Sequence, residues 1–171
     1  MATAILAKKM GMKVLATTRQ ATKSAALERI GVDQILIDDG SICDEVKRAV
    51  AGGVDRALEL VGAPTLRDTL AATRVHGVVC FTGMLSGHWI VEDFYPIDYI
   101  PAGVRLTAYS GEASDLLTDV LQDFIDDVAD GKVTVPIDSV FSLEQIRQAH
   151  SLMESGTAAG KIVVLPEVAT P

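Results

Sequence analysis

Short apolar strands alternate with helices along nearly the whole chain, and this alternation restricts the fold more than any other feature of the sequence. Runs rich in Val, Ile and Thr are separated by helical stretches that end at glycines. Parallel strands need crossover connections, so this alternation favours a parallel sheet covered by helices. Apolar residues make up 49% of the 171 residues and aromatic residues only 5%, which suits such a sheet. The sequence therefore predicts an α/β, doubly wound parallel sheet.

The same pattern gives the expected elements. The predicted strands are residues 13–18, 34–38, 54–61, 77–82 and 104–109, and the predicted helices are 1–10, 21–30, 42–51, 65–74 and 114–130. Ser41 is expected to cap the helix that follows it, and Pro64 suits the first turn of the next helix. Periodicity fails from 84 to 103, which predicts a long loop with one helical turn near Phe94–Tyr99. After Gly131, short strands at 133–136 and 161–165 are expected to flank a helix at 143–154, and 167–171 is expected to be a loose tail.

The order of the first elements carries a further expectation. Met1 to Met10 forms a helix that runs through Gly11 into a strand, which is the second half of a strand–helix–strand unit. In a nucleotide-binding fold, the preceding strand and a glycine-rich turn hold phosphate at the N-terminus of this helix. We therefore expect the fold to lack its first strand and glycine-rich turn, which would lie before Met1.

Charge and reactive side chains argue against several classes of protein. A formal net charge of −8 disfavours nucleic acid and anionic membranes as partners, and no signal peptide or membrane-spanning apolar run is recognised. Two isolated cysteines fit a reducing compartment, which predicts a cytoplasmic location. Ser86 and Ser110 lack a G-x-S-x-G context, so no catalytic residue is predicted. No metal site is expected, because no local ligand pair occurs among Cys43, Cys80, His76, His88 and His150.

The residues that follow the first predicted strand favour NADP as cofactor. In dinucleotide-binding folds the corresponding strand end contacts the adenosine ribose, where an acidic residue selects NAD. Here the strand ends at Thr18 and Arg19, with Lys23 one turn further on. A hydroxyl and two cations can bind a 2′-phosphate. Asp38, at the end of the next predicted strand, is also predicted to be a cofactor-binding residue. Two alternatives remain open: the cations are simply solvated at a helix start, or Asp38 and Asp39 partly cancel their charge.

Two further strand ends carry glycines. Ligands of doubly wound sheets lie at the carboxyl ends of the strands, which singles out Val61 and Gly62 after one strand. It also singles out Gly83, Met84 and Leu85 after the next. Glycine lets the backbone approach a flat ring closely, although a merely tight turn would need glycine as well. The loop beyond contains Trp89, Tyr95 and Tyr99, which either line a substrate cleft or pack in a core or dimer interface.

Several stretches in this order resemble the cofactor-binding domain of the medium-chain dehydrogenase/reductases, on the quinone oxidoreductase-like side, often labelled zinc-binding dehydrogenases. The stretches are Leu6 to Lys8, Gly11 to Val14, Gly31 to Asp33, Val54-Asp55, Leu60 to Gly62, Gly77 to Gly83, Ile146, Ala149-His150 and Gly160 to Val164. The resemblance covers essentially the whole chain. A methyltransferase-like α/β domain matches fewer of these stretches.

The resemblance implies a function and a domain organisation. Residues 1–131 would form a partial NAD(P)-binding domain, and 132–171 a return segment that packs on a catalytic domain in the family. The turn at Gly83 would lie beside the nicotinamide, and Val61-Gly62 beside the ribose. The parent enzyme would reduce a quinone, enone or carbonyl with NADPH, and the strand at Val104–Tyr109 would join a homodimer. The alternative is a non-catalytic, oligomeric remnant that does not bind cofactor productively.

Overall fold

The computed structural model describes residues 1–166, and the tail predicted at 167–171 lies outside them. The chain divides into two compact units, which are described separately. One unit comprises residues 36–116, and the other comprises residues 1–35 together with the chain from Leu117 onward. Strand β2 (Gln34–Ile37), which pairs with β1, crosses the boundary between them.

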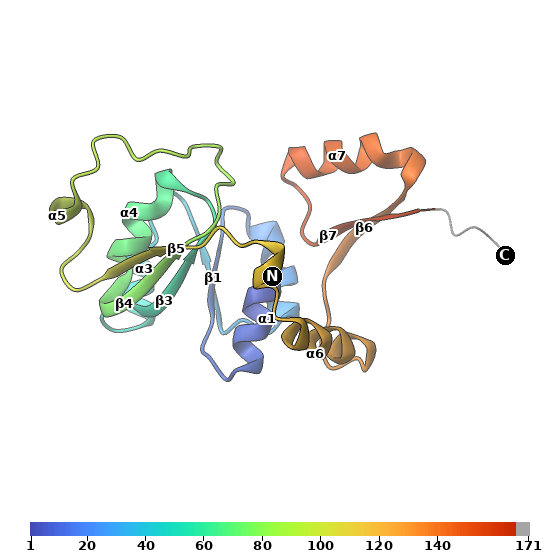
Figure 1. The fold of residues 1–171 in the computed structure, drawn as a ribbon, viewed down its shortest axis with the longest axis horizontal. Coiled ribbons are helices and arrows are strands. Elements are labelled where there is room, and N and C mark those ends of the chain that lie inside the picture. Colours follow the sequence, from blue (N-terminus) through green and yellow to red (C-terminus); the bar gives the residue numbers. More distant parts are fainter. Residues whose placement is uncertain (167–171) are drawn as a thin grey trace. The chain divides into compact units, whose positions relative to one another are not determined.

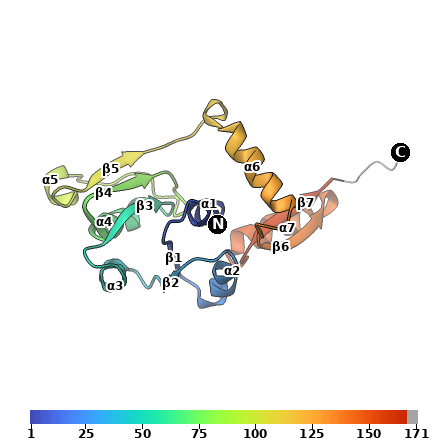
Figure 2. The ribbon, with the colours of Figure 1, turned by 90° about the horizontal axis from the view of Figure 1, so that it is seen from below.

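The unit of residues 36–116 is built on a three-stranded parallel sheet in the order β3-β4-β5. Figure 2 shows β4 between its two neighbours, with α4 beside the sheet. The core joins α4 to the sheet and consists of Leu66, Leu70, Val79 and Val104. The elements of this unit after β2 are α3 (Cys43–Ala49), β3 (Val54–Glu59), α4 (Ala63–Ala71), β4 (Thr73–Phe81), α5 (Pro96–Tyr99), β5 (Arg105–Ala108) and the 3-10 helix η2 (Ala113–Asp115).

The other unit contains a second parallel pair, β6-β7, whose crossover is helix α7 (Figure 1). Helix α7 ends at Gly156, which has a positive φ of 66° and closes the helix as a left-handed cap. The first segment of this unit contains α1 (Ala2–Lys9), β1 (Leu15–Thr18), the 3-10 helix η1 (Ala21–Lys23) and α2 (Ser24–Arg29). The second segment contains α6 (Thr118–Ala129), β6 (Ile137–Ser142), the 3-10 helix η3 (Leu143–Gln145), α7 (Ile146–Ser155) and β7 (Lys161–Leu165).

The α/β class, the alternation and the parallel strands are as the sequence predicts. The five predicted strands all form, and the helical turn in the long loop is α5. The sheet is divided, however: within residues 1–166 the strands form three separate sheets, and β1 is not paired with β3.

Three boundaries differ from the sequence-based expectation. Arg74 was expected in a helix but lies in β4. Helix α4 ends at Ala71, and the buried Thr73 already pairs with Val54 of β3, so the strand begins before Arg74. The prediction of a strand at 133–136 is wrong, because the strand in this region is β6 and begins at Ile137. The amides of Lys132 and Val133 donate instead to the Asp127 carbonyl at the end of α6. The long helix expected at 114–130 is interrupted, with η2 and α6 separated by extended backbone at Leu116 and Leu117.

Ser41 is not the cap of α3, whose N-cap residue is Ile42. The cap comes instead from α4: Asp68 accepts hydrogen bonds from the Ser41 hydroxyl at 2.8 Å and from the Ile42 amide at 2.7 Å. Asp68 thereby satisfies a backbone donor at the start of a helix to which it does not belong. In the described part of the chain, no helix has the length and apolar character needed to cross a membrane.

Candidate functional site

The turns after β3 and β4 are joined by backbone hydrogen bonds in the unit of residues 36–116. The amides of Thr82 and Gly83 both donate to the Glu59 carbonyl, at 3.0 and 3.1 Å. One step further along, the Leu85 amide donates to Leu60 at 3.1 Å, and the Ser86 amide donates to Val61 at 2.9 Å. The structure thus brings Val61-Gly62 and Gly83-Met84-Leu85 together at the carboxyl end of the sheet.

The two glycines of these turns are required by the contact between the turns themselves. A Cβ on Gly83 would lie 2.5 Å from the carbonyl oxygen and 2.6 Å from the Cα of Leu60. Gly62 has φ of +120°, and a Cβ there would lie 3.1 Å from the Ser86 hydroxyl and 3.2 Å from the His88 carbonyl oxygen. Tight packing therefore explains both glycines without a ligand, which is the alternative that the sequence left open.

A buried carboxylate organises the first of these turns, and the sequence-based interpretation missed it. Glu59 is only 3% exposed. Its Oε1 accepts hydrogen bonds from the Val61 amide at 2.7 Å, the Gly62 amide at 3.1 Å and the Thr65 hydroxyl at 2.9 Å. Its Oε2 accepts a fourth from the Thr69 hydroxyl at 2.6 Å. The available signal was an acidic residue in an apolar strand, followed by two threonines four residues apart on one helix face.

The Glu59 carboxylate lies at the N-terminus of helix α4, where it accepts a hydrogen bond from the amide of the N-cap residue Gly62. Gly62 has no side chain to bind the first amides, and no acidic residue lies in the first turn of α4. Glu59, the last residue of β3, places its carboxylate at the N-terminus of α4. A negative charge at this position interacts favourably with the helix dipole. The N-terminus of α4 is consequently filled by a side chain of the protein and is not an open anion site.

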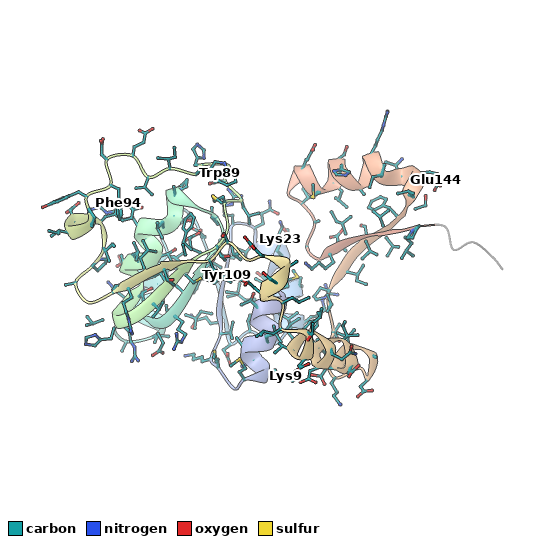
Figure 3. The ribbon with its side chains drawn as sticks, in the orientation of Figure 1. Lys9, Lys23, Trp89, Phe94, Tyr109 and Glu144 are labelled. Carbon is teal, nitrogen blue, oxygen red and sulfur yellow. The ribbon has the colours of Figure 1, made fainter. Side chains whose placement is uncertain are left out.

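The long loop supplies an exposed apolar surface near the second turn. Leu85 is 82% exposed and Trp89 is 67% exposed, whereas Met84 is half-buried. Figure 3 shows Trp89 and Phe94 on this loop. Tyr99 has a different role, because its ring packs edge-on against Phe94 with 5.0 Å between centroids and lies 5.5 Å from the Arg67 guanidinium carbon. Burial raises the pKa of Tyr99, and its ring packs against the core of the unit.

The three predicted 2′-phosphate ligands belong to the other unit, and two of them are hydrogen-bonded to groups of the protein. Thr18 folds back on its own turn, since its hydroxyl oxygen accepts from the Gln20 amide at 3.2 Å. The Lys23 ammonium donates to the Gly156 carbonyl at 2.5 Å, at the C-terminus of α7, where a cation interacts favourably with the helix dipole. Arg19 is exposed, and its side chain makes no hydrogen bond to another residue of the described range. The structure therefore leaves Arg19 as the available cation.

Asp38 lies at the end of β2, in the unit of residues 36–116, and forms a local turn. Its Oδ1 accepts a hydrogen bond from the Gly40 amide at 3.0 Å. This is an Asx-type turn, in which the carboxylate replaces a backbone acceptor. One oxygen of Asp38 is thus engaged by its own loop.

A basic hollow in the unit of residues 1–35 and 117–166 has a structural explanation. Its volume is about 480 Å³, and its lining includes four cations and one carboxylate: Lys8, Lys9, Arg29, Lys132 and Asp127. Lys8 pairs with Asp33 at 2.8 Å, and Asp127 pairs with Lys9 at 2.5 Å. Lys8, Lys9 and Arg29 also lie in the last turns of α1 and α2, where cations offset the negative helix ends. The cations that line this hollow are therefore explained by their ion pairs and by their positions at the C-terminal ends of helices.

No zinc site is supported by the residues that the structure describes. Within 1–166 there is no group of three or more His, Cys, Asp or Glu side chains that could hold a metal ion. The two cysteines are free and lie on different elements, Cys43 on α3 and Cys80 on β4. A structural or catalytic zinc needs three or four converging ligands, so the described residues do not fit the metal.

The fold is a helix-covered α/β fold with two joined turns at the carboxyl end of its three-stranded sheet, and the comparison with known families identifies its class. Residues 30–164 match the family described as zinc-binding dehydrogenase. The chain belongs to this family, within the medium-chain dehydrogenase/reductases, as the sequence resemblance predicts. No curated protein sequence matches the chain.

Solved structures share the fold at low sequence identity. The mycobacterial protein Rv1454c, complexed with NADPH, is 24% identical with a TM-score of 0.80; the match covers 95% of this chain and 52% of that one. A quinone oxidoreductase from Pseudomonas syringae pv. Tomato DC3000 is 19% identical with a TM-score of 0.80, with the same two coverages. An NAD-dependent alcohol dehydrogenase is 22% identical with a TM-score of 0.79, and 95% of this chain covers 46% of it. These likenesses confirm the Rossmann-type fold, and the chain spans about half the length of each structure.

Proposed function

We propose that this chain is the cofactor-binding part of an NADP-dependent oxidoreductase that reduces a quinone, enone or carbonyl by hydride transfer. Membership of the zinc-binding dehydrogenase family carries the proposal. It is supported by the joined turns at Val61-Gly62 and Gly83-Met84-Leu85. When bound, NADPH supplies the hydride, and the protein orients the cofactor and excludes water. An acid–base pair is therefore not required at these turns.

The preference for NADP rests on Arg19. Its guanidinium is exposed and free of partners within the described residues, so it is available to a 2′-phosphate. Lys23 is proposed as a weaker contributor, because binding a phosphate would require it to leave the Gly156 carbonyl. Among similar structures, one is complexed with NADPH and another is described as NAD-dependent, so the proposed preference rests on Arg19 and not on these structures.

The alternative is a non-catalytic remnant that does not bind cofactor productively. Two observations favour it: Lys23 is held by Gly156, and Thr18 is held by its own turn. These two contacts remove two of the three predicted phosphate ligands. The alternative predicts that the purified chain binds NADPH and NADH equally weakly.

A fluorescence titration with both cofactors tests the proposal. NADPH is expected to bind more tightly than NADH, and Arg19→Ala is expected to weaken NADPH binding by roughly 1–3 kcal/mol, the range for a lost charge-assisted contact. NADH binding should be nearly unchanged, because NADH has no 2′-phosphate. Lys23→Ala is the matched control and should have the smaller effect. Equal weakening of both cofactors would contradict the role of Arg19, and no binding of either would favour the remnant.

A further inference from the structure

Glu59 has more hydrogen-bond partners than its place in a strand requires. A buried carboxylate must find partners for both oxygens, and two threonines on α4 would suffice. Glu59 instead also binds the amides of Val61 and Gly62, which follow it in the same turn. For these two amides, Glu59 Oε1 is the acceptor that the structure provides. The conformation of the turn thus depends on one side chain.

The same residue also connects the two turns through its backbone. Its carbonyl accepts the amides of Thr82 and Gly83, while its side chain holds Val61 and Gly62. Glu59 therefore contacts both strand-end turns without lying on the surface that they form. Because charge-assisted hydrogen bonds are stronger than neutral ones, this arrangement fixes the two turns more firmly than backbone bonds alone.

We propose that Glu59 is a positioning residue that sets the backbone geometry of the Val61-Gly62 turn and, through that turn, the affinity for the nicotinamide cofactor. The second half of this proposal rests on the proposed function. Glu59 does not touch the cofactor, since it is 3% exposed and all four of its side-chain contacts are within the protein. Its effect on cofactor binding is indirect: Glu59 holds the Val61-Gly62 turn in place, and a small displacement of that turn weakens its contacts with the cofactor.

Amide hydrogen exchange measured by NMR tests the first half without any cofactor. Glu59→Ala is expected to speed exchange at Val61 and Gly62 by roughly 10- to 100-fold more than at Val79 in the core, as the loss of charge-assisted bonds implies. Glu59→Gln keeps an acceptor at the Oε1 position and should restore most of the protection. The matched control is Thr69→Val, which removes only the contact to Oε2; it should lower thermal stability and leave both turn amides protected.

NADPH titration of the same variants, well below their unfolding temperatures, tests the second half. Glu59→Ala is expected to raise the Kd by about tenfold, whereas Glu59→Gln and Thr69→Val should stay close to the wild type. A purely structural role would make the Kd follow thermal stability, so that Thr69→Val would weaken binding in proportion to its lower Tm. That result, or exchange that rises equally at Val61, Gly62 and Val79, would overturn the proposal.

If the wild-type chain binds no cofactor, the proposed function and the second half of this proposal fail, and the exchange experiment still decides whether Glu59 positions the turn. If Glu59→Ala does not fold, Glu59→Leu replaces it, because Leu fills a similar space and provides no acceptor for the two amides. Its exchange at Val61 and Gly62 must then rise several-fold above that of Glu59→Gln while Val79 stays unchanged, and exchange equal to that of Glu59→Gln overturns the proposal.

Discussion

At the scale of single residues, the approach of the turns after β3 and β4 depends on what Gly83 lacks. Its missing Cβ would lie within 3 Å of three backbone atoms of Leu60. Leu60 directly follows β3, and its carbonyl accepts the Leu85 amide. Its backbone therefore cannot move aside as a flexible side chain can, so a methyl group at Gly83 would force the turns apart. Overpacking of this kind typically costs about 1–3 kcal/mol.

Gly83→Ala is therefore expected to lower the free energy of unfolding by about 1–3 kcal/mol, measured by urea denaturation. Gly111→Ala is the matched control. Its added Cβ would meet the Tyr109 ring, which is exposed and can rotate away, so a loss below about 0.5 kcal/mol is expected, as for ordinary surface changes. Equal losses for the two variants would show that the contact with Leu60 is not rigid.

Sequence reasoning reached part of the candidate site because the carboxyl ends of neighbouring parallel strands must meet. That rule is enough to predict that the turn at Val61-Gly62 lies beside the turn at Gly83-Met84-Leu85. It could not find Glu59, whose role depends on four donors at the right distances, nor foresee that Lys23 bonds to Gly156. Lys23 and Gly156 are 133 residues apart in the sequence, and only the folded chain shows that a helix C-terminus lies within reach of that ammonium.

At the scale of elements, the start of α3 is held by its neighbour α4. Asp68 takes the place of the side-chain cap that the sequence assigned to Ser41. Asp68→Ala should lower the free energy of unfolding by about 0.5–2 kcal/mol, the usual cost of a lost N-cap. Ser41→Ala should cost less, because the Ile42 amide keeps its acceptor. Urea denaturation of the two variants decides between them, and a larger loss for Ser41→Ala would restore Ser41 as the cap.

Helices α1 and α6 are joined by an ion pair with a defined pH dependence. The hydrogen bond from Lys9, together with the charge of Lys132, holds the pKa of Asp127 below its ordinary value of 3.8. A depressed carboxyl pKa stabilises the fold fully above the unfolded-state value, and this stability is lost as the pH falls through the folded-state pKa.

Asp127→Asn is therefore expected to lower the Tm near neutral pH, and its difference from the wild type should shrink as the pH falls below about 4. Thermal melts between about pH 2 and 7 measure this. Asp130→Asn is the control, because within residues 1–166 the ion pair of the Asp130 carboxylate is with the exposed Lys132, and exposed pairs contribute little. A difference that stays constant down to pH 2 would show that the ionised form of Asp127 does not stabilise the fold.

Element boundaries were predictable where local signals and tertiary pairing agree. The strand expected at 34–38 contains the apolar run Ile35 to Ile37, and it forms as β2, Gln34–Ile37, one residue shorter than expected. The strand after Gly131 was misplaced because residues 133–136 have strand-like composition. The Val133 amide instead helps to close α6, and the Pro136 carbonyl accepts a hydrogen bond from the Lys161 amide. Pairing with β7 then starts at Ile137. Composition alone cannot distinguish these two uses of a short apolar run.

At the scale of the whole molecule, the division into 1–131 and 132–171 that the sequence suggests stays a prediction. The strands form three separate sheets, and within residues 1–166 β1 pairs only with β2, while β3 pairs only with β4. Each of these strands therefore has one edge without a strand partner in that range, and unpaired edges require another partner or solvent.

We expect the 171-residue chain alone to have no dehydrogenase activity. It spans about half the length of the similar solved structures, and the proposed function assigns no acid or base to its own residues. The measurement is oxidation of NADPH, followed by absorbance, with quinone and enone acceptors. A reaction without the chain is the control, and turnover above it would show that the chain carries a complete catalytic site.

The last prediction concerns association through β5. Within residues 1–166 this strand pairs only with β4, so its other edge is available. Leu106 is its half-buried residue and packs against the core. A second copy that pairs along the same edge would extend the sheet across a two-fold axis, satisfying the backbone groups of both copies at once. We therefore expect a homodimer joined through β5.

Sedimentation of the wild type and two variants tests this arrangement. Leu106→Pro removes a backbone donor from the strand and should yield monomers. Leu106→Ala keeps the donor and loses only packing, so it should lower stability and leave the dimer intact. Circular dichroism must show that Leu106→Pro stays folded under the conditions used, so that loss of the dimer is separated from loss of the pairing with β4. A wild-type chain that sediments as a monomer at high concentration would contradict the dimer, and dissociation of both variants alike would assign the interface to the core side of Leu106 and not to the strand edge.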